Sequence, residues 1–379
     1  MFFFNKRVDA QVTSKPMRFV SANSQQMSIS GRHEHNVKYI GFSSSGVSIT
    51  FAVQSSDFSI VVEDCLPRRD SLTNWFEVFV GNSSLGKLVL KPGKHEYPIK
   101  IPATIYPSTK PVLIKIVKAT ESAVGEVRFY GIEIPANDRE EDNYEIVTTG
   151  QLKIEFIGNS ITCGYGNMVS IPDQPVGNPL TGFHPHNENA YQSYAMQTAR
   201  RLNALPMLVC YSGRGLYRNF DGDTTETLPK IYDRIHLQNK KSKTWDHSKQ
   251  IPDIIVINLG TNDYYLESQN KPLNDSVFIE TYIQFIEKLI SYYPNAKIVC
   301  ANGSMLNDNW PEGKKCWTRI QNNIRVVCDY FHAKGKASTY SFFFAPQQAP
   351  FGEDYHPSLA THTRMADDLT EFIKTVVIK

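Results

Sequence analysis

Ser160, Asn262 and His356 are three residues whose side chains together can carry out acyl transfer. A serine hydroxyl is a weak nucleophile unless a neighbouring base takes its proton, and histidine is the usual base because its pKa lies near neutral pH. An asparagine amide can donate a hydrogen bond to the oxyanion of a tetrahedral intermediate. These residue types predict a serine nucleophile at position 160, with His356 as its general base.

Each of these residues follows an apolar run that indicates a buried strand, and the runs alternate with helical patterns. Alternating strands and helices predict an α/β domain with a mainly parallel sheet, in which ligands bind beyond the carboxyl ends of the strands. The predicted strands are Ile154–Ile157, Leu205–Cys210, Ile254–Leu259, Lys297–Cys300 and Ser341–Phe344. The predicted helical stripes are Phe278, Tyr282, Phe285 and Leu289; Ile320, Ile324, Val327 and Phe331; and Met365, Leu369, Phe372 and Val376.

The first 135 residues show the two-residue alternation of β-strands instead, with turn residues between short apolar segments. This pattern is typical of an antiparallel β-sandwich. Residues 136–150 are polar and charged and are predicted to link this domain to a second one, residues 151–379. The predicted strands of the sandwich include Val47–Val53, Phe58–Val62, Trp75–Val80, Val112–Val117 and Val127–Ile132.

Glycines after the second strand of the predicted parallel sheet supply further donors for an oxyanion. Ser212–Gly215 follows Cys210 and should reach the same sheet edge as Ser160. The predicted oxyanion donors are the Ser160 N–H, the Gly213 N–H (alternatively that of Gly215) and the Asn262 side chain. The chain has no G-x-S-x-G motif, which disfavours the nucleophile elbow of α/β-hydrolases.

Four segments in order resemble the sequence blocks of SGNH (GDSL) hydrolases. They are Gly158–Thr162 with Asn159 in place of the usual aspartate, Ser212-Gly213, Gly260–Asp263, and the segment around His356. Longer runs are similar to the second family of carbohydrate esterases, which are two-domain acetyl esterases. These runs are Lys118–Glu121, Ser160–Gly166, Glu188–Tyr194, Ser212–Asn219 and Leu228–Arg234, so that the resemblance covers nearly the whole chain.

The resemblance implies a jelly-roll sandwich followed by a three-layer, flavodoxin-like SGNH domain. It implies a serine esterase that needs no metal or other cofactor and removes O-acetyl groups from plant cell-wall carbohydrates such as xylan, mannan or their oligosaccharides. Two alternatives stay open. One is an SGNH lipase or acyltransferase acting on another acyl substrate, and the other is a carbohydrate-binding protein with a non-essential catalytic half.

The sequence does not decide which group orients the imidazole of His356. SGNH enzymes commonly carry an aspartate three residues before the histidine, and Glu353 occupies that position, with Asp354 one residue closer. Either carboxylate could hold the imidazole in the required tautomer. A third alternative is that neither does so, because in some members of this esterase family main-chain carbonyls take over.

The aromatic residues Trp310 and Tyr264 are candidates for substrate binding, because each follows a predicted strand of the parallel sheet. The two H-x-H pairs, His33/His35 and His184/His186, lack further ligands nearby in the sequence and are interpreted as surface loops rather than metal sites.

Composition limits the partners and the location. A formal net charge of +2 without a long basic run argues against a nucleic-acid partner, and no run approaches the about 20 apolar residues of a membrane span. The six cysteines form no C-x-x-C pair and are predicted to be free thiols.

Met1–Lys6 does not resemble a signal peptide, which predicts a cytoplasmic location, or a secreted one if an export signal is missing from this chain. The oligomeric state is open.

Overall fold

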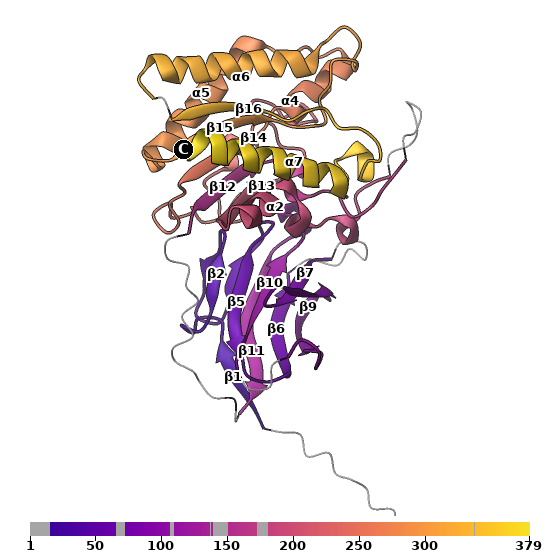
Figure 1. The fold of residues 1–379 in the computed structure, drawn as a ribbon, viewed down its shortest axis with the longest axis vertical. Coiled ribbons are helices and arrows are strands. Elements are labelled where there is room, and N and C mark those ends of the chain that lie inside the picture. Colours follow the sequence, from indigo (N-terminus) through magenta and orange to yellow (C-terminus); the bar gives the residue numbers. More distant parts are fainter. Residues whose placement is uncertain are drawn as a thin grey trace, which may run out of the picture.

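The structure, a computed structural model, has two parts stacked end to end (Figure 1), an antiparallel β-sandwich and a parallel sheet covered by helices. The last strand of the sandwich ends at Pro135, and the first strand of the parallel sheet begins at Lys153. Apart from Ala136 and Asp138, the predicted linker lies outside the described residues, as does the segment Met1–Lys6. The structure describes residues 16–65, 73–106, 110–136, 138, 151–172, 181–336 and 338–379.

Two antiparallel sheets form the sandwich, and the side chains between them make its core. In β5, for example, Ile49, Phe51 and Val53 alternate with less buried neighbours, as a strand with one face in the core requires. One sheet contains β1 (Met17–Ser21), β3 (Glu34–His35), β4 (Ile40–Phe42), β6 (Asp57–Asp64), β9 (Gly93–Lys100) and β11 (Val127–Pro135). The other contains β2 (Ser28–Ser30), β5 (Ser48–Val53), β7 (Trp75–Val80), β8 (Ser83–Val89) and β10 (Val112–Lys118).

The strands β8 and β9 lie outside the segments predicted from the sequence. Both are at sheet edges and bury few side chains, so neither contains a long apolar run. Ser83 and Ser84 belong to β8, although serine is common in turns. Polar composition is common in edge strands because it discourages pairing with other chains.

The second part contains a five-stranded sheet in the order β13-β12-β14-β15-β16, with every neighbouring pair parallel. This is the flavodoxin-like order 2-1-3-4-5, whose ligand sites lie beyond the carboxyl ends of the strands next to the point where the strand order reverses. The strands are β12 (Lys153–Gly158), β13 (Leu205–Cys210), β14 (Ile254–Asn258), β15 (Lys297–Asn302) and β16 (Thr339–Phe343).

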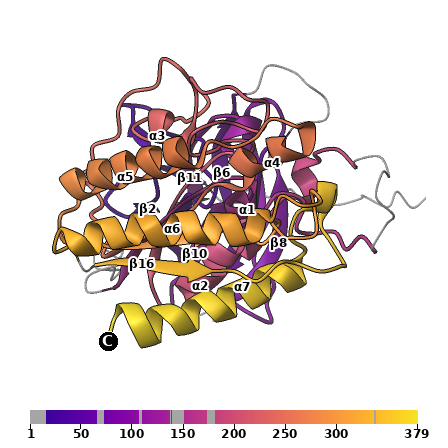
Figure 2. The same ribbon diagram turned by 90° about the horizontal axis from the view of Figure 1, so that it is seen from above.

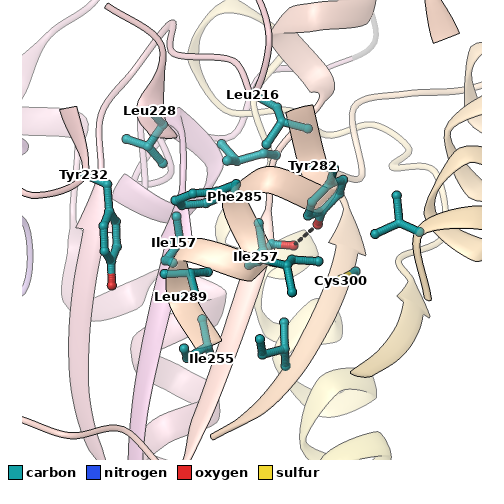
Figure 3. Packing of buried hydrophobic residues seen from close by; sticks show 14 of the residues in the cluster. Ile157, Leu216, Leu228, Tyr232, Ile255, Ile257, Tyr282, Phe285, Leu289 and Cys300 are labelled. Carbon is teal, nitrogen blue, oxygen red and sulfur yellow. Dashed lines mark hydrogen bonds between the residues drawn. The ribbon is translucent and has the colours of Figure 1, made fainter. Parts of the chain in front are cut away.

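Helices cover both faces of this sheet (Figure 2) and complete three layers. Ile255 and Ile257 of β14 pack towards α5 and α6, whereas Ile254 and Val256 pack towards α2 and α7. Figure 3 shows the first of these clusters, in which the Tyr282 hydroxyl donates to the carbonyl of Ile257 at 3.4 Å. The helices are α1 (Ser160–Cys163), α2 (Tyr194–Arg201), α3 (Leu228–Ile231), α4 (Thr261–Tyr265), α5 (Asp275–Tyr292), α6 (Cys316–Ala333) and α7 (Leu359–Phe372).

The apolar stripe at the end of the chain differs from the prediction. Met365 and Leu369 are buried in α7 as expected, but Val376 is exposed, and Ile373 and Val377 are buried in its place. The reason is a π-helical turn over Ile373–Val377, which changes the angular spacing of side chains after α7.

All six cysteines are free thiols, as the sequence predicts, and five of them are buried. None of the described helices is long and apolar enough to cross a membrane.

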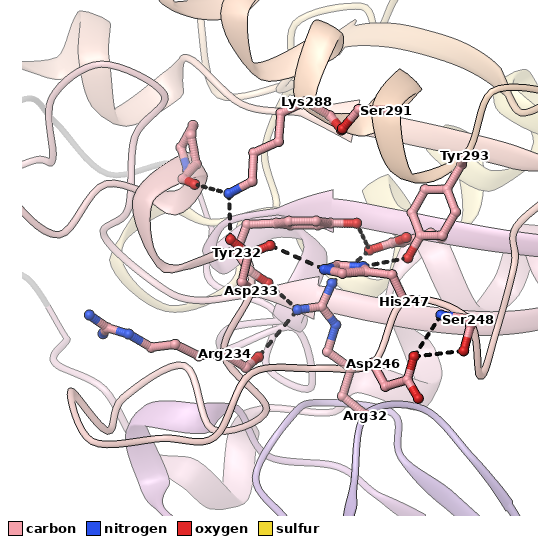
Figure 4. A network of polar contacts seen from close by, with 12 residues as sticks. Arg32, Tyr232, Asp233, Arg234, Asp246, His247, Ser248, Lys288, Ser291 and Tyr293 are labelled. Atoms are coloured by element: carbon pink, nitrogen blue, oxygen red, sulfur yellow. Dashed lines mark hydrogen bonds and ion pairs between the residues drawn. The ribbon is translucent and has the colours of Figure 1, made fainter.

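A buried ion pair joins the two parts of the protein. Arg32 of the sandwich and Glu155 of β12 are both fully buried, and their charged groups lie 3.2 Å apart. The Arg32 guanidinium also lies 4.5 Å from the ring centre of Tyr232 and donates to the main-chain carbonyls of Tyr232 and Arg234 (Figure 4). The Tyr232 hydroxyl donates to the Glu155 carboxylate at 2.8 Å, so each charge has several partners.

We expect Arg32→Ala to lower the free energy of unfolding by about 3–5 kcal/mol, because the variant leaves the Glu155 carboxylate buried without its counter-charge. Arg201→Ala is the matched control, since its partner Asp367 is 61% exposed and a surface pair contributes about 0–1 kcal/mol. Urea denaturation followed by intrinsic fluorescence measures both. Equal losses in the two variants would contradict a structural role for the buried pair.

Candidate active site

Loops from four strands meet at the carboxyl edge of the parallel sheet. Ser160 follows β12, which lies between β13 and β14 where the strand order reverses. The loop after β13 carries Gly213, and α4 after β14 carries Asn262. The 3₁₀ segment Glu353–Tyr355 precedes His356. The structure therefore brings predicted site residues that are far apart in the sequence to one edge.

Ser160 is the first residue of α1, and the turn before it holds it in this position. Asn159 is the N-cap, and its side-chain oxygen accepts a hydrogen bond from the Ile161 N–H at 3.2 Å. Gly158 has no room for a side chain, because a Cβ there would lie 2.0 Å from the Thr162 hydroxyl oxygen. Asn159 therefore caps the helix as an aspartate would, but without adding a negative charge next to Ser160.

His356 and Ser160 form a direct hydrogen bond. Nε2 of His356 lies 2.8 Å from Oγ of Ser160, and Nδ1 lies 3.0 Å from the main-chain carbonyl oxygen of Glu353. A carbonyl only accepts hydrogen bonds, so Nδ1 carries the proton and Nε2 is free to accept the proton of the serine. The ring of Tyr165 stacks on the imidazole with centroids 4.1 Å apart and fixes its plane.

In the described part of the chain, the carboxylates of Glu353 and Asp354 form no hydrogen bond with the imidazole of His356. The Glu353 carboxylate accepts hydrogen bonds from the main chain and ring of His184 at 3.1 and 2.7 Å and from Asn187 at 2.6 Å. The Asp354 carboxylate accepts from the Tyr165 hydroxyl at 2.6 Å and from Thr181 and Gly182 at 2.9 Å. The geometry thus corresponds to the third alternative of the sequence, orientation by a main-chain carbonyl. Nothing in the residue pattern indicates that both carboxylates bind the segment 181–187 or Tyr165 instead.

The two carboxylates hold the loop of His356 in an uncommon main-chain conformation. Asp354 has a φ of 49° and Tyr355 a φ of 60°, a region that residues with a Cβ seldom adopt. Gly352 has no space for a side chain, since a Cβ would lie 2.7 Å from the carbonyl oxygen of Gly166. The segment after Ser160 and the loop of His356 therefore pack against each other through main-chain atoms.

Gly213 lies in the loop after β13, and Asn262 lies in α4 directly after β14. Gly213 has a φ of 76°, and no hydrogen bond within the described chain takes up its N–H. The alternative donor, the Gly215 N–H, already binds the Asn219 side chain at 3.1 Å. The Asn262 amide donates to the Arg214 carbonyl at 2.8 Å, which uses one of its two hydrogens and fixes its orientation.

Asp263 ties these two loops together, a role that the sequence did not reveal. Its buried carboxylate accepts three main-chain hydrogen bonds, from Leu216 at 2.8 Å, Tyr217 at 2.7 Å and Arg218 at 2.9 Å. The Arg218 guanidinium returns a hydrogen bond to the Asp263 carbonyl at 2.8 Å. Burial raises the pKa of Asp263 to about 6, against the lowering effect of these donors. Its position directly after the predicted oxyanion asparagine was the available signal.

The predicted substrate residues have different surroundings. Tyr264 is buried, and its hydroxyl accepts a hydrogen bond from Asn323 at 2.8 Å, so the prediction that it contacts substrate is wrong. Its side chain belongs to the core because it lies on the inner face of α4. Trp310 is 49% exposed in the loop after β15, and its role stays a prediction. Phe220, which the sequence did not single out, is exposed and packs against Gly213, where an added Cβ would lie 2.7 Å from its ring.

Burial of the imidazole lowers the pKa of His356 to about 4, although the Glu353 carbonyl and the nearby Asp354 charge raise it in part. A neutral imidazole is the form that can accept a proton. Together, a nucleophile, a neutral base and preorganised N–H donors at one sheet edge are the elements of ester hydrolysis through an acyl-enzyme.

Comparison with known proteins agrees with this geometry. Residues 156–364 match the GDSL-like lipase/acylhydrolase family, and residues 29–140 match the N-terminal domain of carbohydrate esterase family 2. The chain therefore belongs to the GDSL-like lipase/acylhydrolase (SGNH) family, and its N-terminal part is similar to the N-terminal domain of carbohydrate esterase family 2.

Characterised relatives share moderate to low identity with the chain. The cellulase/esterase CelE of Acetivibrio thermocellus is 36% identical over 260 residues, which are 68% of this chain but only 29% of that protein. An acetylxylan esterase/glucomannan deacetylase of Cellvibrio japonicus is 24% identical over 380 residues, covering 99% of this chain and 96% of the relative.

Solved structures show the same fold. A family two carbohydrate esterase from Clostridium thermocellum in complex with cellohexaose superposes with a TM-score of 0.76 at 28% identity, covering 92% of this chain and 98% of that one. A family two carbohydrate esterase from Cellvibrio japonicus gives a TM-score of 0.77 at 23% identity, covering 96% and 99% of the two chains, and supports the fold alone.

We expect the acid limb of kcat/KM to have its midpoint near pH 4 rather than near 6.5. His356 must be neutral to accept the serine proton, so activity is present above its folded-state pKa of about 4 and is lost as the pH falls through that value. Hydrolysis of p-nitrophenyl acetate, followed between pH 3.5 and 8 with circular dichroism as a control for folding, measures the midpoint. A midpoint near 6.5 in folded protein would contradict this view of the imidazole.

Asp354→Asn and Glu353→Gln should each reduce kcat far less than the about 10⁴-fold loss that follows when the carboxylate of a Ser-His-Asp triad becomes an amide. The reason is that the main-chain carbonyl of Glu353, which both variants retain, holds Nδ1. Steady-state kinetics on p-nitrophenyl acetate tests this expectation. A loss of about 10⁴-fold in either folded variant would show that its carboxylate acts on His356 after all.

Proposed function

We propose that this protein is a serine esterase that removes O-acetyl groups from acetylated plant cell-wall carbohydrates, with xylan, mannan and their oligosaccharides as the substrate class. The observation that carries the proposal is the 2.8 Å contact between Ser160 Oγ and His356 Nε2 at the carboxyl edge of the parallel sheet. The proposal on substrate is supported by two relatives, one named an acetylxylan esterase/glucomannan deacetylase and one solved with cellohexaose.

In the first half of the reaction, Ser160 Oγ attacks the carbonyl carbon of the acetyl ester while its proton passes to Nε2 of His356. The resulting tetrahedral oxyanion accepts hydrogen bonds from the Ser160 N–H, the Gly213 N–H and the Asn262 amide. The intermediate collapses, the bond to the sugar oxygen breaks, and His356 returns its proton to that oxygen. The sugar leaves with a free hydroxyl, and the acetyl group remains on Ser160.

In the second half, His356 takes a proton from a water molecule as the water oxygen attacks the acetyl carbon. The second oxyanion uses the same three donors. Collapse breaks the bond to Ser160 Oγ, which recovers its proton from His356, and acetate leaves. His356 therefore acts as base and then as acid in each half, which the fixed proton on Nδ1 allows without rotation of the ring.

The donors contribute most where negative charge develops. The Ser160 N–H is the first amide of α1, for which the helix itself offers no acceptor, and the helix end favours a negative charge. Removing one oxyanion donor typically costs about 10²–10³ in kcat. The exposed ring of Phe220 beside Gly213 provides an apolar surface on which the acetyl methyl group or a sugar face could pack.

We expect Ser160→Ala to abolish acetate release from acetylated xylan, acetylated glucomannan and p-nitrophenyl acetate, with a loss of several orders of magnitude in kcat, on the order of 10⁶ in a comparable serine enzyme. Acetate is quantified by an enzyme-coupled assay with wild type and variant side by side. Thermal unfolding of the variant serves as the control, because the substitution removes one hydroxyl and its single hydrogen bond to His356 and should leave the fold intact.

Three results would decide against the proposal in different ways. Activity on p-nitrophenyl acetate that survives in Ser160→Ala would remove Ser160 as the nucleophile. A strong preference of the wild type for p-nitrophenyl octanoate over the acetate would favour the lipase or acyltransferase alternative. Binding of xylan and glucomannan oligosaccharides in calorimetry, with no hydrolysis of any ester, would favour a carbohydrate-binding protein.

A further inference from the structure

A glutamate of the sandwich reaches across the domain boundary to the loop that carries Gly213. Glu121 lies between β10 and β11 and is 1% exposed. Its Oε2 accepts a hydrogen bond from the Ser212 N–H at 2.8 Å, and the thiol of Cys163 lies 3.8 Å from the same oxygen. Ser212 directly precedes Gly213, and Cys163 is the last residue of the helix that begins at Ser160. One carboxylate oxygen of Glu121 therefore contacts both the loop that carries Gly213 and the helix that begins at Ser160.

The Glu121 main chain is itself held from both domains. Its N–H donates to the carboxylate of Glu188 in the catalytic domain at 2.8 Å. The ammonium group of Lys118, fully buried in the sandwich, donates to the carbonyls of Thr120 at 2.8 Å and Glu121 at 3.2 Å. A main-chain hydrogen bond of 2.8 Å from the Ala190 N–H to the Ala119 carbonyl adds to this attachment across the boundary. The side chain therefore projects from a fixed base.

The carboxylate performs a task that an apolar side chain of similar size could not. Glu121, Cys163 and Glu188 form a fully buried group of potential metal ligands, but the ammonium group of Lys118 supplies a cation in the same cluster. Burial raises the pKa of Glu121, which shows that the site is costly for its charge. An apolar residue would avoid that cost but would leave the Ser212 N–H without an acceptor and its loop without this anchor.

We propose that Glu121 is a positioning residue for ester hydrolysis, which fixes Ser212 and thereby aims the Gly213 N–H at the oxyanion. The inference rests on the proposed function. Oxyanion stabilisation depends on donors that are in place before charge develops, and a displacement of about 1 Å can cost about 10²-fold in rate. The sandwich then contributes to the rate of the chemical step through a residue that is too deeply buried to touch the substrate.

Kinetics of Glu121→Leu and Glu121→Gln on p-nitrophenyl acetate tests the proposal. Leucine fills the space but accepts no hydrogen bond, so kcat should fall by about 10- to 10²-fold, with KM changed less than about threefold. The amide oxygen of glutamine can still accept from the Ser212 N–H, so Glu121→Gln should retain most of kcat. The acid limb of kcat/KM should stay where it is in wild type, because neither variant changes the partners of His356.

Ser43→Ala is the matched control, since it also removes one hydrogen bond across the domain boundary, between Ser43 Oγ and His236 Nδ1 at 3.2 Å, without touching the loop of Gly213. It should keep wild-type kcat. A normal kcat in Glu121→Leu, or an equal loss in Ser43→Ala, would overturn the positioning role while leaving the esterase proposal intact.

If Glu121→Leu does not fold, Glu121→Asp replaces it. The shortened side chain should lower kcat where Glu121→Gln does not, and equal activity of these two would also overturn the role. A wild type without any esterase activity would instead refute the proposed function.

Discussion

The hydrogen bond from Nδ1 of His356 to the main-chain carbonyl of Glu353 is the contact around which the site is arranged. It sets the tautomer, and the tautomer makes Nε2 the acceptor for Ser160. A carbonyl can do this only if its peptide is held rigidly, which explains why the same loop contains two residues with positive φ and why the side chains of Glu353 and Asp354 are anchored to the segment 181–187. The carboxylates of Glu353 and Asp354 thus hold in place the main-chain carbonyl oxygen that binds His356.

In this arrangement no carboxylate of the described residues forms a hydrogen bond with Ser160 or with the imidazole of His356. Asn159 caps the helix of Ser160 with a neutral oxygen, and a neutral carbonyl stands where many serine hydrolases place a carboxylate. The acyl-transfer intermediate develops its own negative charge close to Ser160, so neutral neighbours reduce repulsion there. One consequence is a weakly basic imidazole, because burial disfavours its protonated form and no hydrogen-bonded carboxylate offsets that effect.

The two domains form one functional unit in this view. The sandwich is joined to the catalytic part by the buried pair of Arg32 and Glu155, and by Glu121, which accepts a hydrogen bond from Ser212 in the loop that carries Gly213. Asp263 fixes the same loop from the other side through three main-chain hydrogen bonds. Both Glu121 and Asp263 are buried carboxylates whose acceptor oxygens satisfy N–H groups that face the inside of the protein. Stability of the domain contact and geometry of the site are therefore linked.

The periodicity of the sequence predicts both folds, which the structure shows, and short motifs single out Ser160, Asn262 and His356 as candidate reacting groups. The strand and helix patterns required the loops of Ser160 and Asn262 to meet at one edge of a parallel sheet, and the block around His356 was recognisable beside them. The partner of Nδ1, the burial of Tyr264 and the position of Glu121 across the domain boundary became visible only in the folded protein. A hydrogen bond needs its donor and acceptor about 3 Å apart, with a tolerance of a few tenths of an ångström, and here the two groups belong to segments far apart in the chain. Residue type and spacing along the sequence do not fix such distances, whereas packing of the domains and loops does.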